Sequence, residues 1–382
     1  MKPSLPFTRT TISLAIAACL GSSAPLISAN PTGGVVVSGN ATFNNSGNVL
    51  TITNTPGAII NWNQFNIGAT ELTNFLQQSS QSTVLNRITG QNGSQILGTL
   101  QSNGRVVLFN PNGIVFGRGA VVNVNELVAT SLNISNADFL ANHFNYSNVG
   151  NAGAVVNQGA ITTPMGGSIY LIGNSVSNQG VLTSPSGKVV LAAGNTVSMT
   201  DSAVPAVSVT LTATSNQAVN LGQISAAGGS VDIYGALVSQ QGVIRADSAT
   251  ANANGQIVLQ ATQSTEDSGT MSATNSAGKG GNIEVLGNNV TLTNTASIDA
   301  SGAMGGGTVL VGGALHGANP NIQNASTSTM AAGSSITADA LNHGNGGNVV
   351  LWSNDTTNFA GSISARGGAQ SGNGGYVETS GA

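Results

Sequence analysis

Paired carboxylates are the side chains in this sequence with the clearest chemical potential, because Asp and Glu beside a Lys or Arg can cleave polysaccharides. Only 13 Asp and Glu occur in 382 residues, and they are scattered along the chain. The one adjacent pair, Glu266 and Asp267, lies in a polar stretch that predicts a solvated loop. An enzyme is therefore only a remote alternative, which depends on stacking that brings distant acids together.

The sequence supplies no other reactive or metal-binding group in a useful pattern. Cys19 is the only cysteine, and His143, His316 and His343 are widely separated. Disulfides, thiolate sites and zinc sites are therefore not expected. The Gly-rich strings lack the regular Asp of calcium-binding repeats. We predict no cofactor and no metal, and an acidic chain without clustered Lys and Arg argues against nucleic acid as a partner.

The first 29 residues have the pattern of a secretory signal peptide. Lys2 and Arg9 give a positive start, and Ile12 to Leu20 is an apolar run too short to cross a bilayer. Ser28-Ala29 offers a small-residue cleavage site. Residues 1–29 are therefore predicted to be a signal peptide, with the remainder passing through the periplasm.

Internal repetition indicates how the rest of the chain is built. Only 6% of residues are charged, against about 25% in an ordinary domain. A Gly-x-(Val/Ile) string recurs every 20 to 28 residues, or at about twice that interval, at Gly167, Gly187, Gly229, Gly255, Gly281, Gly307, Gly347 and Gly375. Each unit has room for about three short alternating strands, which favours one coil of an all-β solenoid over a propeller or sandwich. From residue 30 we expect about fifteen coils, or about 70 Å of rod at about 4.8 Å per coil.

The most specific strings lie between residues 60 and 140. They are Ile60 to Gly68, Val84 to Gly90, Ser94 to Leu100, Asn110 to Gly117, Asn123 to Ser135 and Asn136 to Leu140. Asn110-Pro111-Asn112-Gly113 predicts a tight turn between two strands, because Pro fixes φ and Gly tolerates positive φ. Its direct role is predicted to be structural, and recognition by a partner is a compatible alternative. A helical turn or two is expected only at Glu71 to Gln78.

This run resembles the secretion domain of the filamentous haemagglutinin family across roughly residues 33 to 140, and NPNGI is that family's signature. Gln217 to Gly222 and Gly374 to Gly381 resemble its high-molecular-weight adhesin branch. The resemblance implies a right-handed parallel β-helix with an N-terminal cap. It also implies a TpsA-type exoprotein that leaves the cell through an outer-membrane TpsB-type barrel transporter with periplasmic recognition domains. The implied secretion-motif residues are Asn110, Pro111, Asn112, Gly113, Ile114, Asn123 and Asn133.

These observations predict three segments and one main function. Residues 30–150 form the two-partner-secretion (haemagglutination activity) domain and the capped start of the β-helix. Residues 151–382 continue the repeats and are expected to stop short of a passenger region. We expect a non-enzymatic export domain of an adhesin, secreted or held at the cell surface. The alternatives are a complete short adhesin that binds host or bacterial surfaces and, remotely, a β-helical polysaccharide-degrading enzyme.

Overall fold

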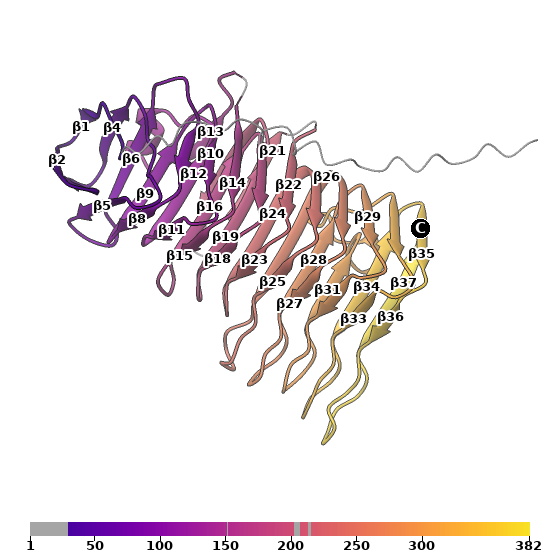
Figure 1. Cartoon of the computed structure of the whole chain (residues 1–382). Helices are drawn as coiled ribbons and strands as arrows, with labels where there is room; N and C mark the ends of the chain where they lie inside the picture. The colour runs from indigo at the N-terminus through magenta and orange to yellow at the C-terminus, as the bar shows by residue number, and fades with distance from the viewer. Residues whose placement is uncertain (1–29, 151, 202–206, 213–214) are drawn as a thin grey trace, which may run out of the picture.

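The chain winds into a solenoid in which each coil contributes three short strands (Figure 1). This computed structural model describes residues 30–382 except 151, 202–206 and 213–214, so the predicted signal peptide lies outside the described residues. One coil holds β16 (Ser168–Gly173), β17 (Ser175–Asn178) and β18 (Val181–Thr183). The next holds β19 (Lys188–Ala193), β22 (Gln217–Asn220) and β23 (Gln223–Ser225), each parallel to its counterpart. The predicted all-β parallel solenoid is confirmed.

Two long sheets run the length of the rod. The first two strands of each coil enter a 21-stranded sheet, and the third enters a 13-stranded sheet. In the described part of the 13-stranded sheet only β2 (Ala41–Ser46) is antiparallel, and the other twelve strands form parallel rungs. The expected fifteen coils were too many, because several coils contain additional segments, such as the hairpin of β20 (Thr196–Asp201) and β21 (Val207–Thr212).

The other elements repeat the same plan. They are β6 (Thr83–Ile88), β7 (Ser94–Ile96), β8 (Thr99–Ser102), β9 (Arg105–Phe109), β10 (Ile114–Phe116), β11 (Val121–Asn123), β12 (Glu126–Thr130), β14 (Ala154–Asn157), β15 (Ala160–Thr162), β24 (Ser230–Gln240), β25 (Val243–Arg245), β26 (Gln256–Asp267), β27 (Thr270–Ser272), β28 (Asn282–Leu286), β29 (Asn289–Leu292), β30 (Ser297–Asp299), β31 (Thr308–Val311), the 3₁₀ turn η2 (Leu315–Gly317), β32 (Thr327–Met330), β33 (Ser335–Thr337), β34 (Asn348–Ser353), β35 (Thr356–Phe359), β36 (Ser362–Ser364) and β37 (Tyr376–Gly381).

The alternating pattern places aliphatic side chains inside the coil, two or three from a long strand such as β16 or β19 and one from a three-residue strand such as β18. In the 13-stranded sheet the middle residues Leu100, Val122, Ile161 and Leu182 stack directly and are completely buried. The recurring glycines mark where neighbouring coils approach most closely. A Cβ on Gly229 would lie 2.0 Å from the carbonyl oxygen of Gly187 in the preceding coil. The repeat is therefore a steric requirement of stacking.

An amide ladder lies inside the solenoid. Asn157 donates to Asn178 at 2.8 Å, Asn178 to Asn220 at 2.8 Å, and Asn220 to Gln240 at 2.7 Å. The next position in register is Asp267. All five side chains are buried, and the ladder satisfies amide groups that would otherwise be costly to bury.

The N-terminal end is capped by antiparallel strands. β1 (Val35–Ser38) pairs with β4 (Ala58–Trp62), and β2 (Ala41–Ser46) pairs with β3 (Val49–Asn54). Beneath them Trp62 makes edge contacts with Phe43 and Phe65, at ring-centroid distances of 5.3 and 5.7 Å. The helical turn expected at residues 71–78 was wrong: β5 (Leu72–Gln77) is a strand, because it pairs in parallel with β3 and β8. Alternation at Thr73, Phe75 and Gln77 outweighs local helix propensity.

A small outer layer covers one face of the 21-stranded sheet. It consists of α1 (Asn136–Leu140), β13 (Phe144–Ser147), β20 (Thr196–Asp201) and β21 (Val207–Thr212), with β13 and β21 antiparallel to β20. Ser135 caps α1 by accepting from the backbone of Asp138. Tyr146, Phe139 and Val197 of this layer form a second apolar cluster with outward residues of the sheet. The layer therefore joins segments about 60 residues apart.

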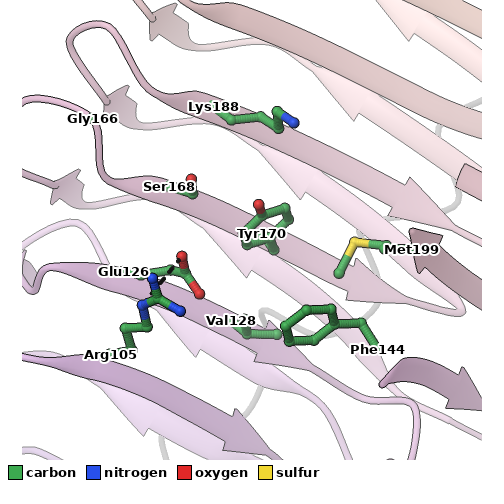
Figure 2. Close-up of a pocket in the computed structure, with 9 residues that line it drawn as sticks. All are labelled: Arg105, Glu126, Val128, Phe144, Gly166, Ser168, Tyr170, Lys188 and Met199. Atoms are coloured by element: carbon green, nitrogen blue, oxygen red, sulfur yellow. Dashed lines mark ion pairs between the residues drawn. The ribbon is translucent and has the colours of Figure 1, made fainter. Parts of the chain in front are cut away.

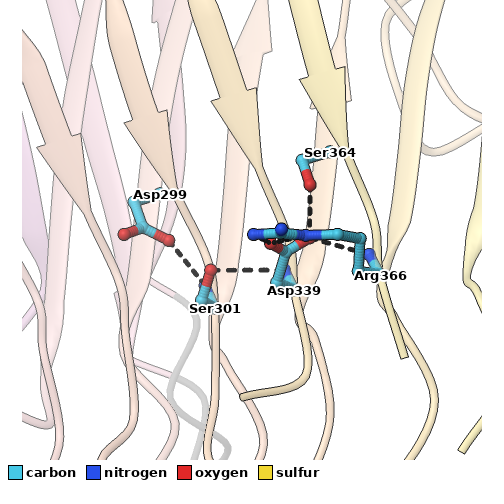
Figure 3. A network of polar contacts seen from close by, with 5 residues as sticks. All are labelled: Asp299, Ser301, Asp339, Ser364 and Arg366. Carbon is cyan, nitrogen blue, oxygen red and sulfur yellow. Dashed lines mark hydrogen bonds and ion pairs between the residues drawn. The ribbon is translucent and has the colours of Figure 1, made fainter. Parts of the chain in front are cut away.

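Acidic side chains fix the turns that follow the 13-stranded sheet. Figure 3 shows Asp339 receiving hydrogen bonds from Ser364 and from Arg366, whose guanidinium lies 2.6 Å from it. The Ser301 hydroxyl accepts from the Asp339 backbone, and the Ser301 backbone donates to Asp299. Burial would raise the pKa of Asp339, but these hydrogen bonds and the positive charge of Arg366 hold it below its usual value.

Candidate partner-recognition site

The signature string forms the predicted turn. The Gly113 backbone donates to the Asn110 carbonyl at 3.0 Å, and the Asn112 backbone donates to the Asn110 side chain at 2.9 Å. Gly113 has φ +99°, a value that glycine tolerates best. Its missing side chain is also needed, since a Cβ would lie 2.7 Å from the Ala154 oxygen. Pro111 and Asn112 therefore occupy the centre of a tight turn.

The same turn is fastened to the coils on both sides. The Asn110 amide donates to the Asn92 carbonyl and to the Ser94 hydroxyl, both at 3.0 Å. In the other direction the Pro111 carbonyl accepts from Gly153 at 2.7 Å. Ile114, which opens β10, is completely buried between its counterparts in β7 and β14. Because Asn110 is also completely buried, the signature holds three coils together.

Arg87 links the solenoid to its outer layer. From β6 its guanidinium donates to Asn133, to the Ile134 carbonyl at 2.8 Å and to Asn136 at 2.9 Å. It also lies 5.2 Å from the ring centre of Phe109. Burial lowers the pKa of Arg87, although a guanidinium stays charged at any ordinary pH. Three acceptors and one aromatic face match the fixed geometry of arginine.

Under the outer layer lies a cavity of about 230 Å³ (Figure 2). Val128, Phe144 and Met199 form its apolar wall. Arg105 and Glu126, 3.9 Å apart, supply a charged wall. Phe144 of β13 and Met199 of β20, which pair in the outer layer, bring that layer over this part of the 21-stranded sheet.

The structure brings together most of the predicted motif residues. Asn110, Pro111, Asn112, Gly113 and Ile114 form one unit. Asn123 and Asn133 lie elsewhere.

Asn133 belongs to the Arg87 contact and bridges Ser147 of the outer layer. Asn123 is exposed on the 13-stranded sheet, away from the turn in sheet order. Arg87 lies in the specific segment Val84 to Gly90, but no role for it was predicted from the sequence. A lone arginine in an apolar strand of a charge-poor chain was the available signal.

One acidic prediction was wrong. Glu266 and Asp267 end β26 and do not form a solvated loop. Asp267 is completely buried, one of its carboxylate oxygens accepts from Gly269 at 3.0 Å, and the other has no hydrogen-bond partner. Burial raises the pKa of Asp267 to about 7. Its position is set by the amide ladder, which local sequence does not reveal.

Stacking also aligns Asp232 and Glu284 two rungs apart in one column. Burial raises the pKa of Asp232 to about 7 and raises that of Glu284. Neither lines the cavity beneath the outer layer. Among the described residues, no group of three or more His, Cys, Asp or Glu could hold a metal, and no helix is long and apolar enough to cross a membrane.

These features define the class of the protein: a capped parallel β-helix whose most specific strings tie coils together. The family model of the TPS secretion domain matches residues 27–273. The crystal structure of the HMW1 secretion domain from Haemophilus influenzae is similar, with a TM-score of 0.87 and 38% identity over 92% of this chain and 95% of that one. This likeness confirms the predicted β-helix class.

Two heme/hemopexin-binding proteins from Haemophilus influenzae share shorter segments. One is 44% identical over 102 residues and the other 37% identical over 90 residues. These segments are 26% and 24% of this chain but 11% and 10% of the relatives. The chain therefore matches only about a tenth of the length of these curated relatives.

The chain belongs to the TPS secretion domain family. Such domains are the N-terminal export domains of two-partner-secretion exoproteins, and an outer-membrane TpsB transporter recognises them and exports them to the cell exterior. The predicted export function is confirmed at this level. The family is a secretion family and not an enzyme family.

Proposed function

We propose that the transporter recognises this chain through its motif-bearing coils before they fold, by means of periplasmic recognition domains. The observation that supports this is the complete burial of Asn110, whose amide is bound within its own chain. A partner that reads Asn110 must therefore meet an unfolded chain. Extended segments of that kind can add a strand to the edge of a receptor sheet.

Folding outside the cell then completes export. Each added coil buries apolar side chains and closes backbone hydrogen bonds, so stacking releases free energy and opposes return through the pore. We assign recognition mainly to residues 30–150, where the NPNG turn and Arg87 lie, and a supporting role to residues 151–382. The product is secreted or retained at the cell surface.

The first test is partner-dependent secretion of the full chain in a Gram-negative host, with and without a candidate barrel transporter. Asn110→Ala should reduce the amount in the medium, whereas Asn289→Ala, at an exposed asparagine outside the motif, should not. Equal secretion without the transporter, or equal secretion of both variants and the wild type, would contradict the proposal.

A second test separates recognition from folding. The periplasmic part of the transporter is immobilised, and full-length chain is added either folded or freshly diluted from denaturant. The unfolded chain should bind more tightly, and Asn110→Ala should weaken that binding. If the folded chain binds at least as tightly, the partner reads a folded surface and the proposed order of events is wrong.

A second proposed function is contact with a host or bacterial cell surface by the exoprotein that carries such a domain. It is supported by the two relatives from Haemophilus influenzae, which are heme/hemopexin-binding proteins and so bind a partner molecule. Labelled folded chain, added to cells with and without a downstream region, would test it. Binding that does not depend on any added region would place the adhesive surface in these coils.

A further inference from the structure

One free edge of the 13-stranded sheet lies in the N-terminal cap. β2 is the first strand of that sheet, and its one strand partner among the described residues is β3, to which it is antiparallel. In an antiparallel pair the backbone groups of every second residue point away from the partner. No described residue outside the pair bonds to the backbone of residues 41–46, so β2 presents a row of unpaired N–H and C=O groups.

This edge lacks the features that usually prevent strands of different molecules from pairing. Natural sheets protect their edges with charged side chains, proline, bulges or a covering segment. β2 has the sequence ATFNNS, with neither charge nor proline, and it pairs with β3 without a register shift. Residues 42–46 are all exposed. The whole segment from residue 30 to residue 70 contains no Asp, Glu, Lys or Arg, so the edge is open and uncharged.

Exposed apolar side chains flank the free edge. Val35 and Val37 of β1 are 62% and 48% exposed, and Phe43 of β2 is 40% exposed. The ring centres of Phe43 and Trp62 are 5.3 Å apart. Gly34, next to Val35, also lies against Trp62, because a Cβ there would be 2.7 Å from the indole. These side chains therefore form one surface, and it is apolar where the terminal repeat of a solenoid usually has a polar outer face.

A second copy of this chain is the occupant that these features favour. A strand can pair with its own copy in antiparallel orientation about a twofold axis, and the contact is then the same on both molecules. The chain as a whole is acidic, with a formal net charge of −4, but two caps can meet without bringing like charges together. A charged partner strand, by contrast, would find no opposite charge on β2.

We propose that two folded copies of this chain associate through β2, which pairs antiparallel with β2 of the second copy. The 13-stranded sheet then continues from one rod into the other, and Phe43 of each copy packs against the facing strand. Six residues a side are few against about 20 to 30 in a standard interface, so the association is weak and depends on crowding of the chains. It needs folded caps, so it goes beyond the proposed export function.

The test measures self-association of the folded full-length chain by analytical ultracentrifugation over a wide range of protein concentrations. The wild type should form dimers as the concentration rises. Thr42→Lys combined with Asn44→Lys places like charges across the twofold contact and should weaken association roughly tenfold. Thr270→Lys combined with Asn289→Lys adds the same charge at exposed strand positions outside the cap and should leave association unchanged.

A charge exchange tests whether the strand meets its own copy. Thr42→Asp combined with Asn44→Asp should also weaken self-association, because its own charges repel across the contact. A mixture of the Lys variant and the Asp variant should associate at least as tightly as the wild type, because opposite charges then face each other. The mixture also controls for folding, since two misfolded variants could not restore association.

Three results would overturn the assignment. The wild type stays monomeric at every concentration, the cap Lys variant and its charge-matched control associate equally, or the mixture associates no better than the Lys variant alone. Partner-dependent secretion of the same variants separates this inference from the export proposal. If the wild type is monomeric and the cap Lys variant loses secretion, the free edge serves the transporter and not a second copy.

Discussion

Asp267→Asn should remove a pH-dependent loss of stability. Asp267 occupies the last polar position of the internal amide ladder, after Gln240, and one of its carboxylate oxygens is buried without a partner. Its pKa is about 7 in the folded chain, against 3.8 for an ordinary Asp, because burial disfavours the charged form. The folded protein therefore holds a proton that the unfolded protein has released between about pH 4 and about pH 7.

The sign and size follow from that difference. With more protons bound to the folded state, stability falls as pH rises through this window, and the full loss is present above about pH 7. A pKa difference of about 3 corresponds to about 4 kcal/mol at ~1.4 kcal/mol per pKa unit. Asp232 has the same sign and adds to the wild-type slope, so the difference between the wild type and Asp267→Asn isolates one group.

The assay is urea unfolding followed by circular dichroism at about pH 4 and about pH 8. Asp267→Asn should resemble the wild type at the lower pH and be more stable by up to about 4 kcal/mol at the higher pH. Glu266→Gln, at the preceding position that points away from the ladder, is the control. A stability difference between Asp267→Asn and the wild type that is equal at both pH values would refute the reasoning.

Three further outcomes are expected from the coil contacts. Asn110→Ala should lower the free energy of unfolding by about 1–3 kcal/mol, because the buried Ser94 hydroxyl and the Asn92 carbonyl lose their donor and the Asn112 backbone loses its acceptor, while Asn123→Ala stays within about 0.5 kcal/mol in the same denaturant titration. Arg87→Lys should lower it by about 1–2 kcal/mol, since one ammonium cannot reach all three acceptors, and an unchanged melting temperature would contradict the clamp. Gly229→Ala should cost about 1–3 kcal/mol through overpacking, whereas Gly374→Ala, whose nearest contact is 3.8 Å away, should be neutral; equal costs would argue against the steric account of the repeat.

The turn at Asn110 to Gly113 could be predicted because its geometry depends on neighbouring residues in the chain. Its fastening to Asn92 and Gly153 could not, since those partners come from the coils before and after it. Arg87 illustrates the same limit. Its string was visible, but its acceptors at residues 133–136 lie almost 50 positions further along.

By itself, the sequence determined that the chain repeats, that each unit holds short alternating strands, and that an export signature precedes the regular coils. The first two features follow from local periodicity and turn chemistry, and the export signature follows from the resemblance of residues 33–140 to a secretion family. Only the tertiary structure decided which residues of neighbouring coils lie next to each other. Stacking in register placed Asp267 on the amide ladder and in the core, and brought Asn92 and Gly153 of the neighbouring coils to the turn at Asn110 to Gly113. The physical reason is that parallel stacking brings together residues that are separated in sequence by whole coils. The register depends on how many residues each loop or hairpin between strands contains, and the short-range pattern does not reveal that number.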